Sequence, residues 1–390
     1  MIDNNNILSI CFTGDIALSK HYEDANSDGS FISDDIKNYI QKTDYAVFNI
    51  EGPICENRGT EVKTFRHVSD EKLVDILETL HNTKSSIWNL ANNHSTDAGK
   101  EGIISTKQLA EKKGSSVIGA GLDINEASFI KYIDGAGGIG ILSLGQTEKG
   151  CPGKPSEKGK PGIFCWSRLL KISKKINEIK SNCRWCVIVA HAGDEFASMP
   201  MPYIRNRYLK FLNMGADIIV AHHPHVVQNY EIIGNKAIFY SLGNFIFDTD
   251  YQRHAIGSDI GILLKIHFSP DKFYFEEKAI HITRNNDKQI VPCETPVIFT
   301  NIDEQEYRRI LTYAAWDCYM TRHRIFSYMS SGKLFKYMCP YLLTYLSFIR
   351  RGLFKIDKLK VPILIIFYLL GVRCSQKDNK ILNYLKAKNV

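Results

Sequence analysis

The sequence lacks a continuous apolar run of the ~20 residues that a membrane-spanning helix requires. Two apolar runs near the C-terminus, residues 337–349 and 361–372, are both too short. Residues 1–15 contain no basic segment followed by a long apolar core, so we expect no secretory signal. A hydrophobic content of 44% and a charged content of 23% are typical of a soluble globular protein. The cytosol is therefore the expected compartment.

A cysteine framework and internal repeats are also missing. The ten cysteines are scattered without regular spacing, and Cys183 and Cys186 form one C-x-x-C pair. A structural zinc site normally needs a second pair or nearby histidines. Cys186 also begins an apolar segment that reads as a strand, so a buried thiol is the favoured interpretation. Reduced thiols fit a cytosolic protein.

A net positive charge is missing outside the C-terminal region. The 390 residues carry a formal net charge of +7, but residues 333–390 alone hold twelve Lys and Arg against two Asp, a local charge of +10. The preceding residues therefore carry a net charge of −3. We predict one domain over residues 1–290 and a helical, basic extension over residues 300–390, and we expect no nucleic-acid partner.

Short apolar segments alternate with helical patterns, which predicts an α/β fold. Apolar periodicity and end signals predict helices over residues 31–41, 73–80, 99–113, 167–179 and 203–214. Strands are predicted over residues 7–12, 45–50, 86–90, 116–118, 139–144, 187–190, 218–221, 237–240, 259–268 and 272–282. The Pro, Gly and Lys residues of segment 150–162 predict a long loop, which is either a functional lid or plain disorder.

Polar side chains follow five of these strands. They supply carboxylate, amide or imidazole groups, and they are Asp15, Asn49 with Glu51, Asn93 with His94, His191, and His223 with His225. A mixture of these groups suits Mn²⁺, Fe²⁺ or Zn²⁺. We expect one or two divalent ions; two ions ~3.5–4 Å apart would hold both the attacking and the leaving oxygen and lower the pKa of a bound water.

The run H-H-P-H at residues 222–225 carries the strongest single signal. Pro224 restricts its own φ and biases the preceding residue towards extended backbone. We therefore expect His223 and His225 on one side of an extended turn at the end of a strand, where open α/β sheets bind ligands. Taken alone, the run is also compatible with three surface histidines in a polar loop.

A second polar group follows the predicted strand 237–240. Ser241, Gly243 and Asn244 are expected to form a tight turn there, with the two polar side chains facing the same edge of the sheet. This turn would add an amide and a hydroxyl group to the site.

Seven motifs occur in the order found in one family. They are F-T-G-D at 12–15, F-N-I-E-G-P-I at 48–54, T-F-R at 64–66, N-L-A-N-N-H-S-T-D-A-G at 89–99, H-A-G-D-E-F at 191–196, H-H-P-H-V-V-Q at 222–228 and Y-S-L-G-N-F-I-F-D at 240–248. The chain resembles the CapA-type capsule and poly-γ-glutamate synthesis proteins of the calcineurin-like metallophosphoesterase superfamily. The resemblance covers about residues 7–250 and implies a four-layer αββα sandwich with its site at one edge of the paired sheets.

The resemblance also implies roles for individual residues. Asp15 and His225 would bind a first metal, Glu51 would bridge, and the ligands of a second metal would be Asn93, His191 and His223. His94 would protonate the leaving oxygen, with Asp97 orienting it. Arg66 would hold a phosphate or carboxylate group. The expected substrate-binding residues are Asn49, Glu195, His222 and Asn244.

The sequence departs from the pattern of ordinary metallophosphoesterases at two metal positions. Ala17 stands where these enzymes place a histidine, and the bridging residue is Glu51 rather than an aspartate. Ala192 and Ala221 replace the Trp and Gly that the capsule family often has. The first two differences concern the number of bound ions and therefore the ester chemistry.

Two functions remain open at this point. One is a metal-dependent hydrolase that acts on a phosphate ester or an amide-linked anionic polymer of the cell envelope. The other is a non-hydrolytic assembly or export factor that binds the carboxylates of the polymer. Capsule-synthesis proteins are expected partners in both cases.

The C-terminal extension gives a prediction from sequence alone. Its two apolar runs alternate with basic residues, as expected either for a packed two-helix cap or for interfacial helices on an anionic membrane. We expect peripheral binding to the cytoplasmic face of the membrane. The full chain should co-sediment with anionic vesicles at low salt, and a chain ending at Gly332 should not. Equal solubility of both would show that the extension is a packed cap.

Overall fold

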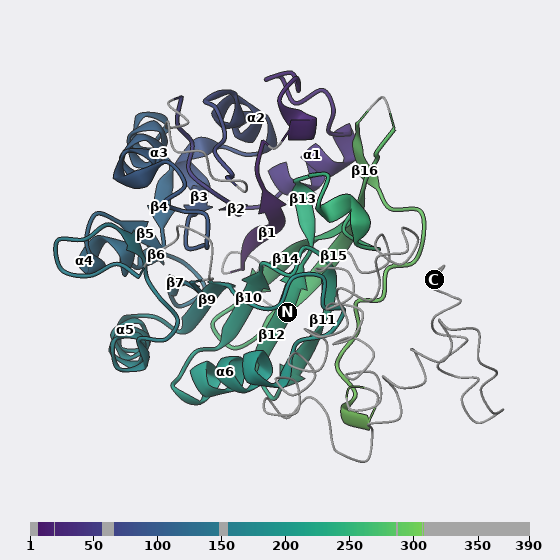
Figure 1. Ribbon diagram of the computed structural model, residues 1–390. Helices are drawn as coiled ribbons and strands as arrows, with labels where there is room; N and C mark the ends of the chain where they lie inside the picture. The colour runs from purple at the N-terminus through teal and green to yellow at the C-terminus, as the bar shows by residue number, and fades with distance from the viewer. Residues whose placement is uncertain are drawn as a thin grey trace, which may run out of the picture.

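The computed structural model describes residues 7–18, 20–56, 66–147, 155–285, 288–305 and 307 (Figure 1). The predicted loop 150–162 falls partly outside these residues, and the extension 300–390 almost wholly does. The helices and the membrane-binding surface predicted for the extension therefore stay predictions. Within the described residues, no helix combines the length and the hydropathy that crossing a membrane would require.

The first sheet is built around β1 (Leu8–Ile16). On one side of it lie three parallel strands, β2 (Tyr45–Ile50), β3 (Ser86–Asn89) and β4 (Ser116–Ile118). On the other side the order is continued by the antiparallel strands β14 (Ile260–Phe268), β15 (Phe273–Ile282) and β16 (Ile290–Pro292). The short β13 (Asn244–Ile246) pairs in parallel with the last residues of β1, beyond the point where β14 stops.

The second sheet has a parallel centre and antiparallel edges. Its order is β11 (Val227–Ile233), β12 (Lys236–Leu242), β10 (Ile218–His222), β9 (Trp185–His191), β7 (Ile139–Gly145) and β6 (Lys131–Ile133). A separate pair is formed by β5 (Ala120–Gly121) and β8 (Gly162–Ile163). All residues of β7, β9 and β10 are buried, as expected for parallel strands that are covered on both faces.

Six α-helices and three short 3₁₀ turns complete the described part of the chain. The helices are α1 (Asp34–Gln41), α2 (Lys72–Leu80), α3 (Gly99–Lys113), α4 (Ile124–Ala127), α5 (Leu169–Asn182) and α6 (Pro202–Asn213). The turns are η2 (Lys20–Tyr22), η3 (Thr83–Ser85) and η4 (Gln252–His254). Their ends follow from local chemistry: Pro202 occupies the first turn of α6, and Gly114 ends α3 in the left-handed conformation.

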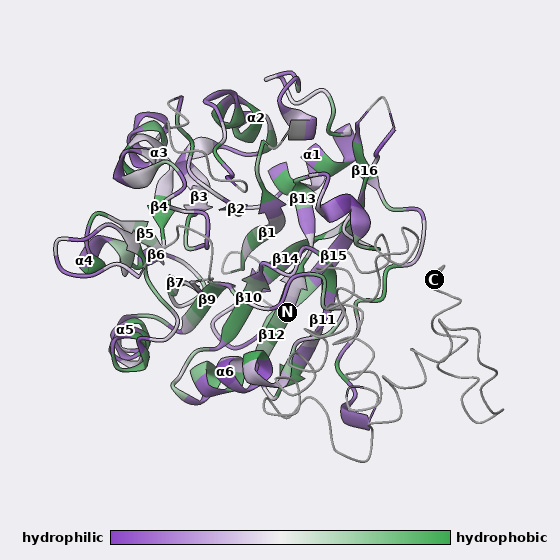
Figure 2. Cartoon of the chain, in the orientation of Figure 1, coloured by the Kyte–Doolittle hydropathy of each residue, from purple (hydrophilic) through white to green (hydrophobic). Residues whose placement is uncertain are grey.

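The two sheets pack face to face, and helices cover their outer faces. Alternation along β9 shows this directly. Val187 and Val189 belong to the core between the sheets, whereas Cys186 and Ile188 belong to the core beneath α5 and α6. Each of these side chains is fully buried, which stabilises the fold by about 1–3 kcal/mol per side chain. Figure 2 shows the central strands mostly hydrophobic and the helices two-sided.

The predicted α/β sandwich is therefore confirmed at the level of its sheets and helices. Most predicted elements occur within a few residues of their expected ends, and β2, α3 and β4 have the predicted bounds.

Cys186 is a buried free thiol, as predicted, and burial raises its pKa above the ordinary range. The described chain continues to pack on the body as far as Tyr307, whose hydroxyl donates to the Pro200 carbonyl at 2.8 Å. The predicted division between residues 290 and 300 stays a prediction.

Three local predictions need correction. The first strand continues to Ile16, so Asp15 lies inside β1 rather than beyond its end. Asn244 begins β13 instead of completing a tight turn. His223 and His225 have φ values of 100° and 57°, so the backbone around Pro224 is not extended at these two histidines. The first two differences share one cause, because parallel pairing between β1 and β13 overrides the local backbone preference.

Gly243 allows the chain to pass from one sheet to the other. It lies between β12 of the second sheet and β13 of the first, with a φ of 68°. A Cβ atom at this position would lie 2.5 Å from the carbonyl oxygen of Ile260. Its own carbonyl accepts a hydrogen bond from the Asp15 amide at 2.9 Å. Only glycine satisfies both the backbone angle and the close approach.

Gly243→Ala should therefore lower the free energy of unfolding by clearly more than the ~1–2 kcal/mol cost of a left-handed alanine. Gly234→Ala is the matched control, because Gly234 has a φ of 60° and no atom of the described residues within 4 Å of the added Cβ. Urea denaturation of the two variants measures the difference. Equal losses would show that crowding at Gly243 does not matter.

Candidate metal centre

The candidate site lies where the carboxyl ends of the parallel strands of both sheets meet. In the first sheet, Asp15 pairs with Asn49 across β1 and β2. In the second sheet, His191 pairs with His222 across β9 and β10. His222 connects the two sheets, because its Nε2 lies 2.9 Å from the carbonyl oxygen of Thr13 on β1.

Asp15 is fully buried and held from several sides. Asn49 Nδ2 donates to Asp15 Oδ1 at 2.5 Å, and the His223 amide lies 3.4 Å from Oδ2. His225 Nδ1 is 3.1 Å from the same Oδ2. Burial by itself raises the pKa of Asp15, but the hydrogen bond and charge of His225 outweigh it and the pKa falls below its ordinary value. Asp15 is therefore an anion at neutral pH.

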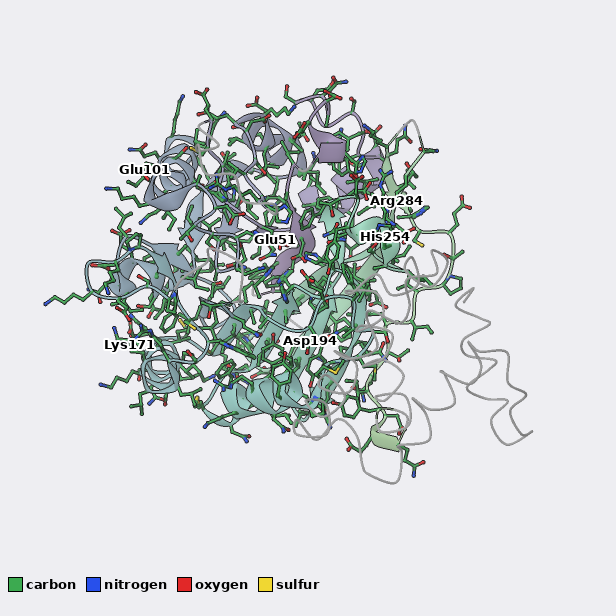
Figure 3. All side chains as sticks on the ribbon, viewed as in Figure 1. Glu51, Glu101, Lys171, Asp194, His254 and Arg284 are labelled. Carbon is green, nitrogen blue, oxygen red and sulfur yellow. The ribbon has the colours of Figure 1, made fainter. Side chains whose placement is uncertain are left out.

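Glu51 is the buried centre of the site, directly after β2 (Figure 3). Neither of its carboxylate oxygens has a hydrogen-bond partner among the residues that the structure describes. Three imidazole nitrogens surround Oε1: His225 Nε2 at 3.6 Å, and His191 Nε2 and His94 Nε2 at 3.9 Å each. Burial raises the pKa of Glu51 well above its ordinary value.

The histidines respond to burial in opposite ways. Burial lowers the pKa of His191 well below its ordinary value, and the neighbouring imidazoles His223 and His222 lower it further. Burial also disfavours the charged form of His225, but the negative charges of Glu51 and Asp15 outweigh this and raise its pKa to about 10. His191 is thus a neutral imidazole, and His225 carries a proton that a bound cation would have to displace.

Of the groups of side chains that could each hold one ion, two consist entirely of residues predicted as ligands from the sequence. The first ligand set is Asp15, Glu51 and His225, and the second ligand set is Glu51, His191 and His223. In each set the donor atoms lie within 4.8 Å of one another. Asn93 joins the second set, since its Oδ1 is 3.0 Å from His191 Nε2. A buried carboxylate without hydrogen bonds from the described residues, beside neutral imidazoles, fits a divalent cation.

His94 lies beside the first set and is held by Asp97. His94 Nδ1 is 2.8 Å from Asp97 Oδ2, which fixes the ring so that Nε2 points to Glu51. Both residues are buried. The structure thus brings the predicted proton donor and its predicted orienting partner together.

Two residues in the site were not predicted from the sequence. Asn92 accepts hydrogen bonds from the amides of Gly52 at 3.2 Å and His94 at 3.1 Å, and it donates to the Ile50 carbonyl at 2.7 Å. It therefore fixes the backbone around Glu51 and His94. His67 was not predicted because no predicted strand precedes it.

The other predicted residues surround this centre. Asn244 Oδ1 lies 3.0 Å from His225 Nδ1, and Glu195 accepts from the Tyr251 hydroxyl at 3.1 Å. His222 and Asn49 are buried and hydrogen-bonded within the protein, and their predicted contact with substrate stays a prediction. Arg66 is half-buried and directly precedes His67.

A family profile described as "Bacterial capsule synthesis protein PGA_cap" matches residues 9–249, the region that contains both ligand sets. The chain belongs to this family. The family was predicted from the motifs, and that prediction is confirmed.

Two curated relatives illustrate the similarity. "Capsule biosynthesis protein CapA" of Bacillus anthracis is 29% identical over 255 residues, covering 64% of this chain and 62% of the relative. "PGA biosynthesis protein CapA" of Bacillus subtilis (strain 168) is 30% identical over 256 residues, covering 64% and 66%. The match thus spans less than two thirds of either relative. A solved structure of a hypothetical protein from Thermus thermophilus is 11% identical, covers 69% of this chain and 99% of its own, and has a TM-score of 0.38, too low to support an argument.

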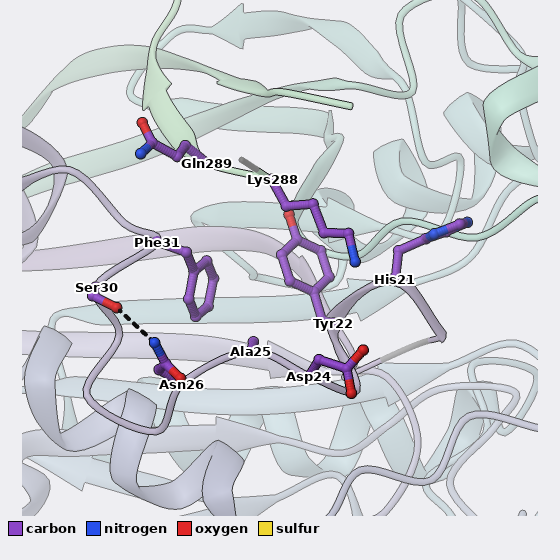
Figure 4. Close-up of a pocket in the computed structure, with 9 residues that line it drawn as sticks. All are labelled: His21, Tyr22, Asp24, Ala25, Asn26, Ser30, Phe31, Lys288 and Gln289. Atoms are coloured by element: carbon purple, nitrogen blue, oxygen red, sulfur yellow. Dashed lines mark hydrogen bonds between the residues drawn. The ribbon is translucent and has the colours of Figure 1, made fainter. Parts of the chain in front are cut away.

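A cavity of about 350 Å³ lies elsewhere, between η2 and the residues before β16 (Figure 4). Tyr22 and Phe31 form part of its wall, and Asn26 Nδ2 donates to Ser30 Oγ at 3.4 Å. None of the residues of the two ligand sets lines it. It is therefore separate from the candidate metal centre.

Metal binding should depend on pH. The first ligand set must lose the proton of His225, whose pKa is about 10, before this imidazole can bind a cation. The apparent affinity for Mn²⁺ or Zn²⁺ should therefore rise roughly tenfold per pH unit between about pH 6.5 and about pH 8.5, for each proton displaced. Competition with a chromophoric chelator measures this slope. His225→Ala should bind more weakly with a shallower slope, and an affinity independent of pH would contradict the assignment.

Proposed function

We propose that this chain is a metal-dependent, hydrolase-like protein of capsule or exopolymer biosynthesis. Its substrate would be a phosphate ester or an amide-linked anionic polymer of the poly-γ-glutamate type. The observation that carries the proposal is the Glu51 carboxylate, which is buried without a hydrogen bond from any described residue and faces three imidazoles. Burying a carboxylate in this way is costly unless a cation compensates it. The names of the two Bacillus relatives support the biosynthetic context.

The arrangement of layers supports a metallophosphoesterase-like fold. Hydrophobic clusters lie between the two sheets and also beneath the helices on both outer faces. The ligand sets occupy one edge of the paired sheets, which is the position expected from the family resemblance.

The ligand sets would hold one or two divalent ions such as Mn²⁺, Fe²⁺ or Zn²⁺. Asp15, Glu51 and His225 would bind the first ion, and His191, His223 and the shared Glu51, assisted by Asn93, the second. A bound ion supplies Lewis-acid polarisation of the substrate and makes water a better nucleophile at neutral pH. The low pKa of His191 keeps its nitrogens available as ligands.

His94 would deliver the proton to the leaving oxygen. Asp97 holds the Nδ1 side of the ring at 2.8 Å, so Nε2 is the atom that faces Glu51 and the ligand sets. An ionised carboxylate beside Nδ1 stabilises the protonated imidazole before transfer. Arg66, beside His67, would bind a phosphate or carboxylate of the substrate.

In a second candidate function, the same residues bind the polymer without catalysing a reaction. Ala17, which stands where ordinary metallophosphoesterases have a histidine, is 1% exposed and offers no ligand atom. The first ligand set therefore has three residues, which favours weak or single-ion binding. A protein with this site would bind the polymer's carboxylates during assembly or export, together with capsule-synthesis partners at the cytoplasmic face of the membrane.

Metal-dependent ester hydrolysis separates the two functions. Protein loaded with Mn²⁺ should hydrolyse both phenyl phosphate and p-nitrophenyl phosphate, and chelation should abolish both activities. His94→Ala should lose ~10²–10⁴-fold on phenyl phosphate and less on p-nitrophenyl phosphate, because the better leaving group needs little protonation.

Metal content measured on the same samples serves as the control, since His94→Ala should retain the ions of both ligand sets. Equal losses on the two esters would contradict proton transfer by His94. Metal-loaded wild-type protein without any esterase activity would favour the non-hydrolytic function.

A further inference from the structure

We propose that His67 completes a third ligand set, Glu51, His67 and His94, which binds a divalent cation of the zinc type. The inference rests on the proposed metal-dependent function and assigns a role to a residue outside both sequence-predicted sets. One donor atom from each of the three side chains lies within 4.8 Å of the others. The third set shares Glu51 with the first two sets, and His67 belongs to it alone.

The distances suit a small cation. Zn–N and Zn–O bonds of about 2.0–2.2 Å place two ligand atoms roughly 3.5 Å apart in tetrahedral geometry. Glu51 Oε1 and His94 Nε2 are 3.9 Å apart, so a shift of a few tenths of an ångström brings them into range. Neither oxygen of Glu51 is hydrogen-bonded by a described residue, so both remain available as ligand atoms.

One carboxylate contacts both histidines of the third set, one through its ring and the other through its backbone amide. Asp97 Oδ2 lies 2.8 Å from His94 Nδ1 and accepts a hydrogen bond from the His67 amide at 2.7 Å. The His67 and His94 rings are 4.2 Å apart between centroids, and the His67 ring also packs edge-on against Phe247 at 4.8 Å. A carboxylate that holds the far nitrogen of an imidazole is the usual partner of a metal-binding histidine.

The backbone around Glu51 holds His67 in place. A Cβ atom on Gly52 would lie 1.7 Å from the His67 carbonyl oxygen, so the segment can approach only because residue 52 is glycine. Two residues further on, Ser69 is tied to the same strand end: its amide donates to the Pro53 carbonyl at 3.0 Å, and its carbonyl accepts from the Cys55 amide at 2.9 Å. His67 is therefore held near Glu51 by the close approach at its own carbonyl and by the backbone hydrogen bonds of Ser69.

Occupation of the third set has a chemical consequence. His94 Nε2 can either bind a cation or carry the proton for the leaving group, because both use the same lone pair. A cation held by His67 and Glu51 would thus compete with the proposed proton transfer. The third set gives excess zinc a defined inhibitory site.

The test counts bound ions. Full-length protein is stripped with a chelator, dialysed against buffers of defined free Zn²⁺, and analysed for zinc per chain. His67→Ala should bind roughly one ion fewer at saturation than the wild type, because a three-ligand site rarely survives the loss of one ligand. His67→Phe should behave in the same way, since it keeps the ring contacts with His94 and Phe247 but has no nitrogen. Both variants retain the backbone amide of residue 67 that donates to Asp97.

His281→Ala is the control for adventitious binding, because His281 is an exposed histidine near Asp259, on β15. It should bind as many ions as the wild type. Equal, non-zero zinc counts for wild type, His67→Ala and His67→Phe would overturn the third ligand set and leave the proposed function intact. No zinc in any of the proteins would overturn the third ligand set, and the esterase assay with Mn²⁺ would then decide the proposed function separately. Near-ultraviolet circular dichroism verifies that the variants are folded, and the phenylalanine variant decides if the alanine variant is not.

Discussion

A buried carboxylate that no described residue hydrogen-bonds is the feature on which this site depends. Removing an ionised group from water costs several kcal/mol unless nearby charges or ligands compensate it. Glu51 is fully buried, and imidazole nitrogens lie around it, but no described residue donates a hydrogen bond to it. The pKa of Glu51 is raised for the same reason, because burial disfavours the charged form. A divalent cation would compensate this charge, which is why the proposed function assigns a metal ion to the site.

The two sheets make this arrangement possible by ending at a common edge. His222 ties β10 to β1 through the Thr13 carbonyl, and Gly243 brings the chain across from β12 to β13. Asn244 then reaches His225, and Asn92 fixes the backbone beside Glu51. The buried amide side chains of Asn244 and Asn92 thus hold the candidate ligands in position. Such enclosed polar networks stabilise one geometry because each unsatisfied member would be costly.

Neighbouring imidazoles in the site differ in their pKa and therefore in their charge. His191 is held neutral by burial and by its neighbours, whereas His225 is held protonated by Asp15 and Glu51 in the absence of a cation. His94 is oriented by Asp97, which also fixes the backbone of His67. Pairs of groups whose environments separate their pKa values are a usual property of sites that bind metals or transfer protons. In this chain both rings lie near Asp15 and Glu51, but His191 is next to several other imidazoles, whereas His225 is closer to both carboxylates and hydrogen-bonded to Asp15.

The sequence by itself determined the family, the alternation of strands and helices, and all residues of the first two candidate ligand sets. It could do so because parallel strands end at one edge of a sheet, so residues such as Asp15, Glu51 and His191 converge whatever the details of packing. Only the tertiary structure decided that β1 continues through Asp15 and that Asn244 lies in β13 of the first sheet. The same holds for the positive φ values of His223 and His225. The contact between His67 and His94 was also visible only in the tertiary structure. It depends on the close approach of the His67 backbone to Gly52, which no local sequence pattern predicts.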